Sequence, residues 1–100
     1  MKHSFRLKKS QIKTVFTEKL DIKSVSIENK SDVENAITNI LVFNDLDSYL
    51  NPIDCNYNFI NTSISFQLEL NPERDKKDFF KTIKKFSDFI DNTTEKEKAN

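Results

Sequence analysis

An alternation of apolar and polar residues over positions 53–70 constrains the fold of this chain more than any other feature. From Ile60 to Leu70 the apolar residues stand at even positions, which is the two-residue period of a half-buried strand. From Ile53 to Phe59 they stand at odd positions, so the two runs share an apolar face only if the chain turns or bulges between them. We therefore predict a hairpin of two strands with its turn at Asn61–Thr62.

A phenylalanine-rich helix is predicted directly after the hairpin. Asn71 is a favourable N-cap, and Pro72 suits the first helical position, where no amide partner is needed. Apolar residues then recur at spacings of four, three and four, which makes one stripe along a helix. The stripe consists of Phe79, Ile83, Phe86 and Ile90, widened by Phe80 and Phe89. Because phenylalanine is only a middling helix former, we expect these rings to be packing groups against the sheet.

The N-terminal third of the chain contains weaker patterns. His3 to Lys8 alternates as a short strand, and Asp21 to Glu28 alternates as a second strand. Between them, residues 10–20 fit a helix capped by Ser10, but their β-branched and aromatic residues fit a strand nearly as well. The sequence leaves helix and strand open over this segment.

A further helix is predicted to begin at the capping box Ser31–Glu34 and to end near Phe43. Its apolar face consists of Val33, Ala36, Ile37, Ile40 and Leu41. A short helical turn through Leu46 to Leu50 follows, and Asn51–Pro52 is expected to stop it. Together these elements predict an α+β fold, a small mainly antiparallel β-sheet with two or three helices packed on one face. Residues 1–91 are expected to form one domain, and residues 92–100 a polar, disordered tail.

The charges balance overall but not locally. Residues 1–23 carry seven basic residues against two acidic ones, and residues 24–70 carry one against seven. Zero net charge gives no overall steering toward nucleic acid or membranes. Neither a signal peptide nor a membrane-spanning apolar stretch is visible, so we expect a cytoplasmic protein with no membrane contact. The abundance of Asn and Lys over Arg suggests a low-GC genome.

The absence of glycine excludes several recognisable sites. A phosphate-binding loop, a dinucleotide fingerprint and a nucleophile elbow all need glycine for tight turns. The chain has one histidine, His3, close to the start, where it is a poor catalytic base. We predict no catalytic residues and no cofactor.

Metal binding is not expected either. One cysteine and one histidine cannot close a zinc site. Asp45, Asp47 and Asp54 resemble oxygen ligands, but an EF-hand loop begun at Asp45 would have Leu50 where glycine is required and Asn56 where glutamate is required. Cys55 is expected to be a small buried hydrophobe on the strand face shared by Ile53 and Tyr57.

Two basic groupings make nucleic-acid binding the alternative function. If the fold brought them together they could follow a phosphate backbone, and Phe5 could stack on a base. The candidate contacts are Arg6, Lys8, Lys9 and Lys13 near the start, and Lys77, Lys81, Lys84 and Lys85 on the last helix. Acidic residues interrupt the second grouping, which is also typical of a solvated helix face laced with ion pairs.

The function predicted first is a non-catalytic protein-binding module, such as an adaptor, an inhibitor or an accessory protein. An uncovered sheet face would expose apolar residues, and such a patch usually marks a partner surface or a homodimer seam. The residues predicted for this surface are Leu46, Tyr49, Tyr57 and Phe59, together with Asp45 and Asp47. An enzyme that uses carboxylates alone is the third hypothesis; it requires two carboxylates facing each other in a cleft.

Overall fold

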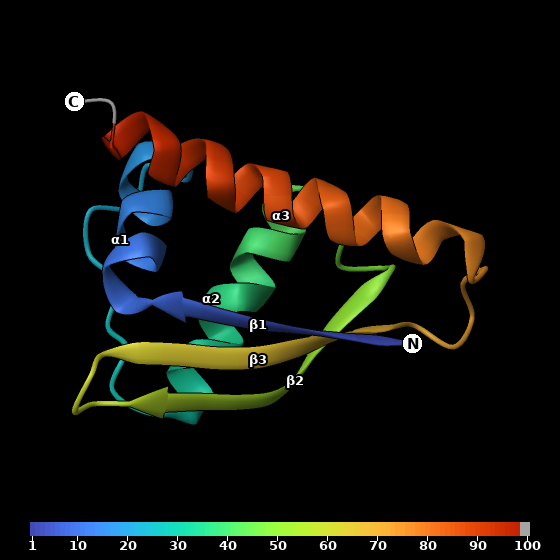
Figure 1. The fold of residues 1–100 in the computed structure, drawn as a ribbon, viewed down its shortest axis with the longest axis horizontal. Helices are drawn as coiled ribbons and strands as arrows, with labels where there is room; N and C mark the ends of the chain where they lie inside the picture. The colour runs from blue at the N-terminus through green and yellow to red at the C-terminus, as the bar shows by residue number, and fades with distance from the viewer. Residues whose placement is uncertain (99–100) are drawn as a thin grey trace.

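Over residues 1–98, which the computed structural model describes, the chain forms a three-stranded antiparallel sheet with three helices packed on one face (Figure 1). The elements are β1 (Lys2–Lys8), α1 (Lys9–Glu18), α2 (Lys30–Phe43), β2 (Leu50–Asn58), β3 (Ser63–Leu70) and α3 (Lys77–Lys98). The predicted α+β class is therefore confirmed.

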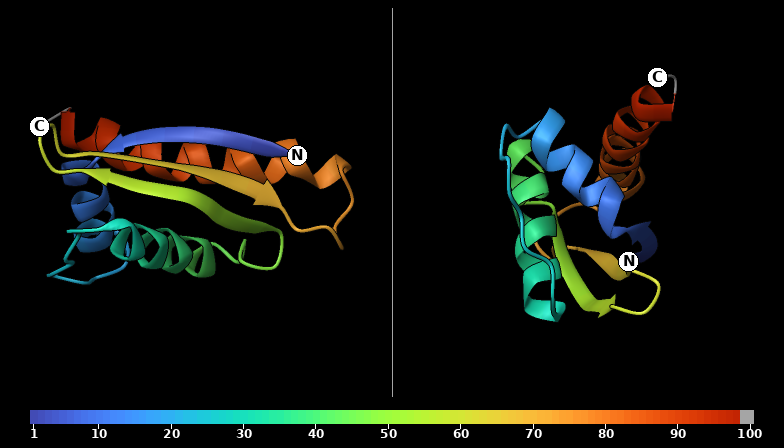
Figure 2. Two further views of the ribbon diagram at one scale, coloured as in Figure 1. Left: turned by 90° about the horizontal axis from the view of Figure 1, so that it is seen from below. Right: turned by 90° about the vertical axis from the view of Figure 1, so that its left-hand side faces the viewer.

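The sheet has the strand order β1-β3-β2, with both pairs antiparallel. The predicted hairpin is confirmed as β2 and β3, and the predicted first strand as β1. All three helices lie on one side of the sheet, α2 beside β2 and α3 over β1, which leaves the other face of the sheet open (Figure 2). The molecule therefore has two layers, with the core between them.

Even-numbered residues of β3 supply the sheet side of the core. Ile64, Phe66, Leu68 and Leu70 are all buried, as their alternation predicts. Phe5 of β1 stacks on Phe66 with 5.2 Å between ring centroids, and both rings meet Phe86 of α3 edge-on. Such pairs add stabilisation beyond the area they bury. This three-ring cluster fixes α3 over the β1 side of the sheet.

The prediction of an apolar stripe on α3 is confirmed for its central residues and wrong for Phe80 at one margin. Phe79, Ile83, Phe86 and Ile90 are buried, whereas the side chain of Phe80 is 71% exposed. Phe80 lies about 100° around the helix from Phe79, beyond the width that the sheet covers. Phe89 is half-buried and contacts Phe43 of α2, with 5.6 Å between the ring centroids.

The start of α3 differs from the prediction. The helix begins at Lys77, and Asn71 instead closes a turn: its Oδ1 accepts the Glu73 amide, and its Nδ2 donates to the Ser48 carbonyl. Arg74 also donates to Ser48 O, at 3.1 Å. Asp75 Oδ1 accepts from the Lys77 amide, which makes Asp75 the cap. These contacts with a loop distant in sequence hold residues 71–76 outside the helix.

The end of α3 also differs. The helix continues through residues 92–98, where we expected a disordered tail, and Thr93 is buried with its hydroxyl bonded to Phe89 O. Residues 99 and 100 of that predicted tail lie outside the described part of the chain. The buried side of α3 therefore extends beyond Ile90 as far as Thr93.

Residues 10–20, for which helix and strand were both open, form α1 as far as Glu18. Ser10 is not the cap, because the helix follows β1 directly at Lys9, and the Lys8 amide donates to Gln11 Oε1 at 2.7 Å. Ile12, Val15 and Phe16 are buried at the helical spacing. The helix forms because this spacing buries all three side chains on one side.

The strand predicted over Asp21–Glu28 is wrong, since this segment is an irregular connection between α1 and α2. Ile27 is fully buried and Val25 half-buried, but no strand of the described chain pairs with them. An alternating pattern becomes a strand only where a sheet edge accepts its backbone groups. Here Ile27 reaches the core from a loop.

The N-cap of α2 lies two residues earlier than predicted. Asn29 is the N-cap, its side chain accepting from the Asp32 amide, while Asp32 Oδ2 accepts from the Glu28 amide. The apolar face of α2 and its end at Phe43 are confirmed. Hydrogen bonds to Leu46 O from the Tyr49 and Leu50 amides form the expected helical turn. The turn ends at Leu50, and the chain continues from there as β2, with Pro52 opposite Leu68.

Candidate functional site

The structure does not bring the predicted partner-surface residues together. Asp45, Leu46, Asp47 and Tyr49 precede the first residue of β2, whereas Tyr57 and Phe59 stand at its other end. The eight residue steps from Tyr49 to Tyr57, at about 3.3 Å per residue, separate the two groups by about 26 Å. Leu46 is buried at 3% exposure, so the prediction that it lies on the surface is wrong. The uncovered sheet face carries none of these four apolar side chains.

In the first group, Tyr49 contacts a loop that is distant in sequence. The Arg74 guanidinium lies 4.2 Å from the centroid of the Tyr49 ring, a cation–π contact. Asp45 adopts a left-handed backbone with φ of 58°, and both Asp45 and Asp47 are exposed. Leu46 and Tyr49 therefore serve to hold the fold together at this end of the sheet, and of the four residues only the acidic Asp45 and Asp47 are exposed.

The β2–β3 hairpin tip is the most exposed apolar feature of the described chain. The side chains of Phe59 and Ile60 are 77% and 83% exposed, more than any other large apolar side chain that the structure describes. Phe59 was predicted from the sequence, but Ile60 was assigned to the apolar strand face and its exposure was missed. The strand pairing ends at Asn58 and Ser63, which puts Ile60 in the turn.

Hydrogen bonds from two asparagines hold the tip in one conformation. Asn58 Oδ1 accepts from the amides of Ile60, at 2.9 Å, and Asn61, at 3.4 Å. Asn61 Oδ1 accepts from the Ser63 amide at 3.0 Å, next to Thr62 with its left-handed φ of 54°. The pattern Asn-x-x-Asn flanking two apolar residues is the sequence signal that could have identified the tip.

Tyr57 lies just before the tip but on the covered side of the sheet. It pairs with Ile64 across the hairpin, and the Lys9 ammonium lies 5.4 Å from its ring centroid. The ring is therefore half-buried between β3 and the start of α1, and only its margin is available to a partner.

A bulge in β2 separates two residues that the sequence placed on one face. The β2–β3 register shifts between Ile53 and Asn56, where Asp54 has a φ of 50°. Ile53 stands opposite Gln67 and faces the open side, whereas Cys55 packs against the core. The predicted common face of Ile53, Cys55 and Tyr57 is therefore wrong for Ile53.

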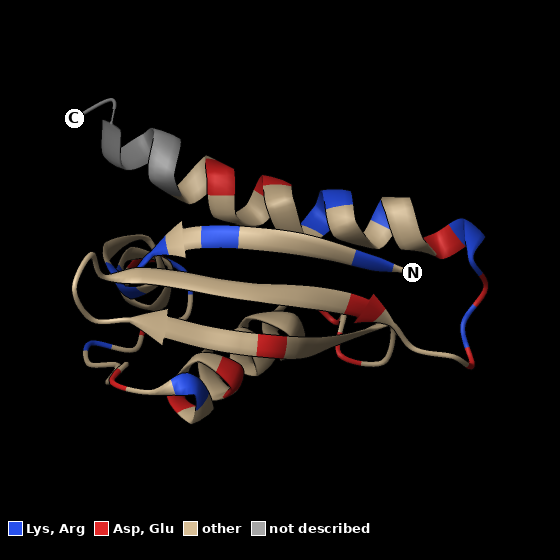
Figure 3. Ribbon diagram, turned by 60° about the horizontal axis from the view of Figure 1, so that its bottom comes forward, with Lys and Arg blue, Asp and Glu red and all other residues tan. Residues whose placement is uncertain are grey.

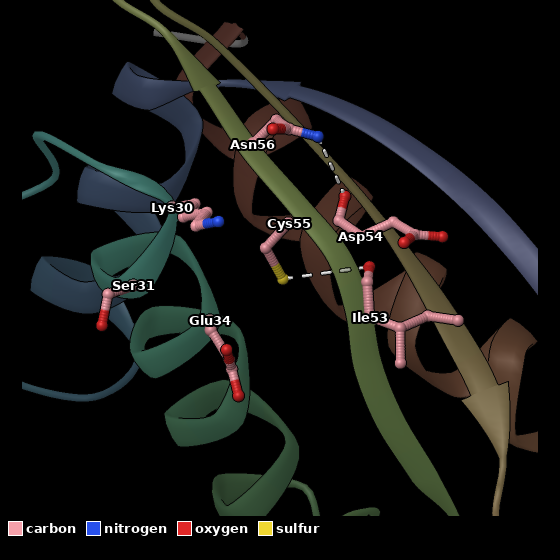
Figure 4. Close-up of a pocket in the computed structure, with 7 residues that line it drawn as sticks. All are labelled: Lys30, Ser31, Glu34, Ile53, Asp54, Cys55 and Asn56. Carbon is pink, nitrogen blue, oxygen red and sulfur yellow. Dashed lines mark hydrogen bonds between the residues drawn. The ribbon is translucent and has the colours of Figure 1, made fainter.

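Beside the bulge, β2 and the first turns of α2 enclose a groove of about 540 Å³ (Figure 4). It is lined by Lys30, Ser31, Glu34, Ile53, Asp54, Cys55 and Asn56. In Figure 4 the Cys55 sulfur points toward α2 and the Asp54 carboxylate points away from it. Burial, followed by the negative charges of Glu34 and Asp54, raises the pKa of the Cys55 thiol to about 11. The thiol is therefore protonated near neutral pH and is a weak nucleophile.

The basic candidates lie on two different sides of the molecule (Figure 3). Arg6 and Lys8 pair with Ser65 and Ser63, so their side chains stand on the open face of the sheet. The α3 lysines belong to the helix layer: Lys84 pairs with Asp88 at 2.7 Å, and Lys85 donates to Asn44 O at 2.8 Å. The hydrogen bond to Asp88 and its charge raise the pKa of Lys84.

The other basic candidates are spread along the helices. Lys13 is exposed on α1, whereas Lys77 and Lys81 are exposed on α3. Phe5, predicted to be able to stack on a base, is instead held between Phe66 and Phe86. The two groupings thus do not form one continuous surface around an available aromatic ring.

Carboxylates and metal-binding residues are likewise dispersed. Asp45, Asp47 and Asp54 are exposed at separate points, and Glu69 stands 3.8 Å from the Lys2 ammonium. Among the side chains that the structure describes, no three His, Cys, Asp or Glu residues gather closely enough to hold a metal ion. No helix within residues 1–98 is both long enough and apolar enough to cross a membrane.

No protein-family model matches the chain, and neither do any curated proteins or solved structures.

Proposed function

We propose that this protein is a non-catalytic protein-binding module, an adaptor or accessory protein whose partner docks on the hairpin tip. The observation that carries the proposal is the exposure of two adjacent large apolar side chains, Phe59 at 77% and Ile60 at 83%. Exposed apolar groups gathered at one place are typical of interaction sites. With a single cysteine in the sequence, we further propose that it acts in a reducing compartment such as the cytoplasm.

Order at the tip strengthens the argument. The two asparagine side chains bond three amides of the turn, so Phe59 and Ile60 project from a backbone that is already fixed. A partner that buries a pre-organised loop avoids most of the entropy cost of ordering it. An aromatic ring and a branched aliphatic side chain side by side also make a compact anchor of the kind that fills a partner's pocket.

The proposal is tested with the double variant Phe59→Ser/Ile60→Ser and a matched control, Phe80→Ser. All three side chains are mostly exposed, so the urea midpoint of each variant should stay near that of the wild type. Immobilised wild-type protein and Phe80→Ser should retain the same proteins from an extract of the source organism, and the tip variant should lose them. Partners retained equally by the tip variant would refute the proposal.

Light scattering on the same variants identifies the case in which the partner is a second copy of the chain. A dimer of the wild type that dissociates in the tip variant supports the tip as the interface. A dimer unaffected by the tip substitutions places the interface elsewhere and contradicts the proposed docking site.

Nucleic-acid binding is the second candidate function, and the exposed Lys77 and Lys81 with the neighbouring Lys84 on the outer side of α3 favour it. It predicts binding to mixed-sequence DNA or RNA that weakens steeply with salt and with Lys81→Glu/Lys84→Glu. Fluorescence anisotropy at low and physiological salt decides this. Absence of binding at low salt would remove this candidate.

A further inference from the structure

The two outer edges of the sheet differ in their capacity to accept another strand. With the order β1-β3-β2, β1 and β2 each have an edge with which no strand of the described residues pairs. The edge of β2 is interrupted by Pro52, which has no amide hydrogen, and by the bulge between Ile53 and Asn56. Proline and bulges are features that block strand addition.

The edge of β1 has neither feature. Its pairing with β3 runs without a shift from Lys2 opposite Glu69 to Lys8 opposite Ser63. The Leu70 amide donates to Met1 O, and the Lys9 amide donates to Thr62 O, so the odd-numbered residues exchange hydrogen bonds with β3. The N–H and C=O groups of Lys2, Ser4 and Arg6 therefore point outward, as a template for an added strand.

Side chains along this edge define what kind of strand fits. The even-numbered residues stand on the open face of the sheet and include Lys2, Arg6 and Lys8. Lys2 is 3.8 Å from Glu69 in an exposed pair, while no ion pair is recorded for Arg6 or Lys8 among the described residues. On the helix side of the edge, Phe5 and Leu7 are half-buried, so each keeps some uncovered apolar surface.

A second copy of the chain is a poor occupant of this edge. In an antiparallel self-pairing centred on Ser4, Lys2 would stand opposite Arg6 of the other copy, and in one centred on Phe5 it would stand opposite Lys8. Like charges directly opposite each other destabilise a strand pair. Charge complementarity therefore favours an acidic strand from a different protein.

We propose that the outer edge of β1 binds an extended acidic segment of a partner protein as a fourth strand. Carboxylates four residues apart in that segment stand opposite Lys2 and Arg6, and the apolar residues between them stand opposite His3 and Phe5, on the helix side of the edge. Backbone hydrogen bonds supply affinity, and the alternating side chains supply specificity. This inference rests on the proposed function and names the chemistry of a partner segment.

The test uses the full chain and three labelled peptides in fluorescence anisotropy. The first has the sequence Ser-Glu-Val-Thr-Val-Glu-Ser, the second replaces both Glu by Lys, and the third, Ser-Glu-Glu-Thr-Val-Val-Ser, keeps the composition but changes the spacing. Saturable binding of the first peptide alone supports the proposal. Equal binding of the lysine peptide or of the respaced peptide would overturn it.

Variants of the protein locate the binding edge. Arg6→Glu should weaken binding of the first peptide about tenfold, because one opposite-charge pair becomes a like-charge pair. Lys81→Glu makes the same change in net charge on α3 and should leave the affinity within about twofold. Equal losses in both variants would mean that only net charge attracts the peptide, which would refute binding at β1.

Ser4→Pro tests the backbone part of the proposal. It removes an outward-pointing amide hydrogen without removing a hydrogen bond between β1 and β3, so the urea midpoint should change little while peptide binding is lost. Should Ser4→Pro not fold, the Arg6→Glu variant still tests whether the peptide binds at β1.

Partners that require Phe59 and Ile60, combined with no peptide binding, would refute this inference and leave the proposed function standing. Peptide binding that depends on the β1 edge, combined with no partner that depends on Phe59 and Ile60, would support this inference and refute the docking site at the tip.

Discussion

The two faces of the sheet are formed by alternate residues of the same strands, and they differ in burial and in polarity. Along β3, Ile64, Phe66, Leu68 and Leu70 are buried under the helices, whereas Ser63, Ser65, Gln67 and Glu69 between them are half-exposed. The covered face carries the apolar contacts and the ring cluster. The open face carries polar groups, the half-buried Ile53 and no aromatic ring of β3, while the two most exposed large apolar side chains, Phe59 and Ile60, stand at the hairpin end of the sheet. This difference assigns the packing that stabilises the fold to the covered face, and the docking site that we propose lies at the end of the sheet.

The largest expected effect comes from the centre of the covered face. Phe86→Ala should lower the free energy of unfolding by about 3–5 kcal/mol, because a fully buried ring leaves a cavity against Phe5 and Phe66. Phe80→Ala on the same helix, with a ring 71% exposed, should change it by no more than about 0.5 kcal/mol. Urea denaturation measures both. Equal losses would show that α3 does not pack as described.

The rate at which the Cys55 thiol is alkylated tests how deeply it is buried at the margin of the covered face. Because its pKa is about 11 rather than the ordinary 9.0, its thiolate fraction at pH 8 should be about a hundredfold below that of an ordinary thiol. Alkylation by iodoacetamide should be correspondingly slow, and Glu34→Gln should speed it by removing a negative charge. A matched control is Ser65→Cys in a Cys55→Ser background, which places the thiol on the open face.

The same shift predicts the direction of a change in stability with pH. The unfolded thiol ionises near its ordinary pKa of 9.0, while the native thiol keeps its proton to about 11. The contribution of Cys55 to stability is therefore complete below pH 9.0 and is lost as the pH rises toward 11. Comparison with Cys55→Ser over this range isolates the effect. Half-maximal alkylation of Cys55 near pH 9.0 would contradict both predictions.

A smaller effect is expected at the bulge that turns Ile53 onto the open face. Asp54 has a left-handed φ of 50°, and Asp54→Val should cost about 1–2 kcal/mol because a β-branched side chain is strained there. Asp54→Gly should cost nothing or stabilise the protein by a few tenths of a kcal/mol, since glycine adopts this conformation freely. Thermal denaturation of the pair measures the difference. If both substitutions destabilise equally, the backbone at this position is not left-handed.

The smallest effect belongs to the open face. Gln67→Ala should change the free energy of unfolding by less than about 0.5 kcal/mol, because this half-exposed side chain stands on the open face of the sheet, opposite Ser4 and Ile53. Urea denaturation beside Phe86→Ala makes the comparison direct. A loss above 1 kcal/mol would mean that the open face is packed against something, such as a second copy of the chain.

Local pattern was sufficient for the hairpin and the two long helices, although it left α1 open between helix and strand. The β2–β3 hairpin, the apolar face of α2 and the buried residues of α3 were predicted from spacing alone, because a strand and a helix each repeat their buried side at a fixed period. The same reasoning failed over Asp21–Glu28, where alternation was present but no edge of the sheet received it. It also failed at Asn71, which satisfies a cap motif but bonds to Ser48 instead.

The candidate site was predictable only in part. Phe59 was found because the turn had to lie close to it, but Ile60 was assigned to the strand because parity cannot locate the last paired residue. The open edge of β1 was not visible in the sequence, since strand order is set by which strands meet in space. The chain also has no glycine, so aspartates hold three of the left-handed positions in the described chain. Without a glycine at Asp21, Asp45 or Asp54, no strong turn signal marked these positions.

The sequence by itself determined the hairpin and the two long helices, most of the buried residues of each, and the absence of glycine-dependent sites, because these depend on neighbours a few residues apart. Tertiary structure alone decided that β1 pairs with β3, that Phe5 joins the rings of Phe66 and Phe86, and that Ile53 turns outward at a bulge. It also separated the predicted partner residues to opposite ends of β2. Contacts between distant segments depend on how all the buried faces fit together, and no single stretch of the chain contains that information.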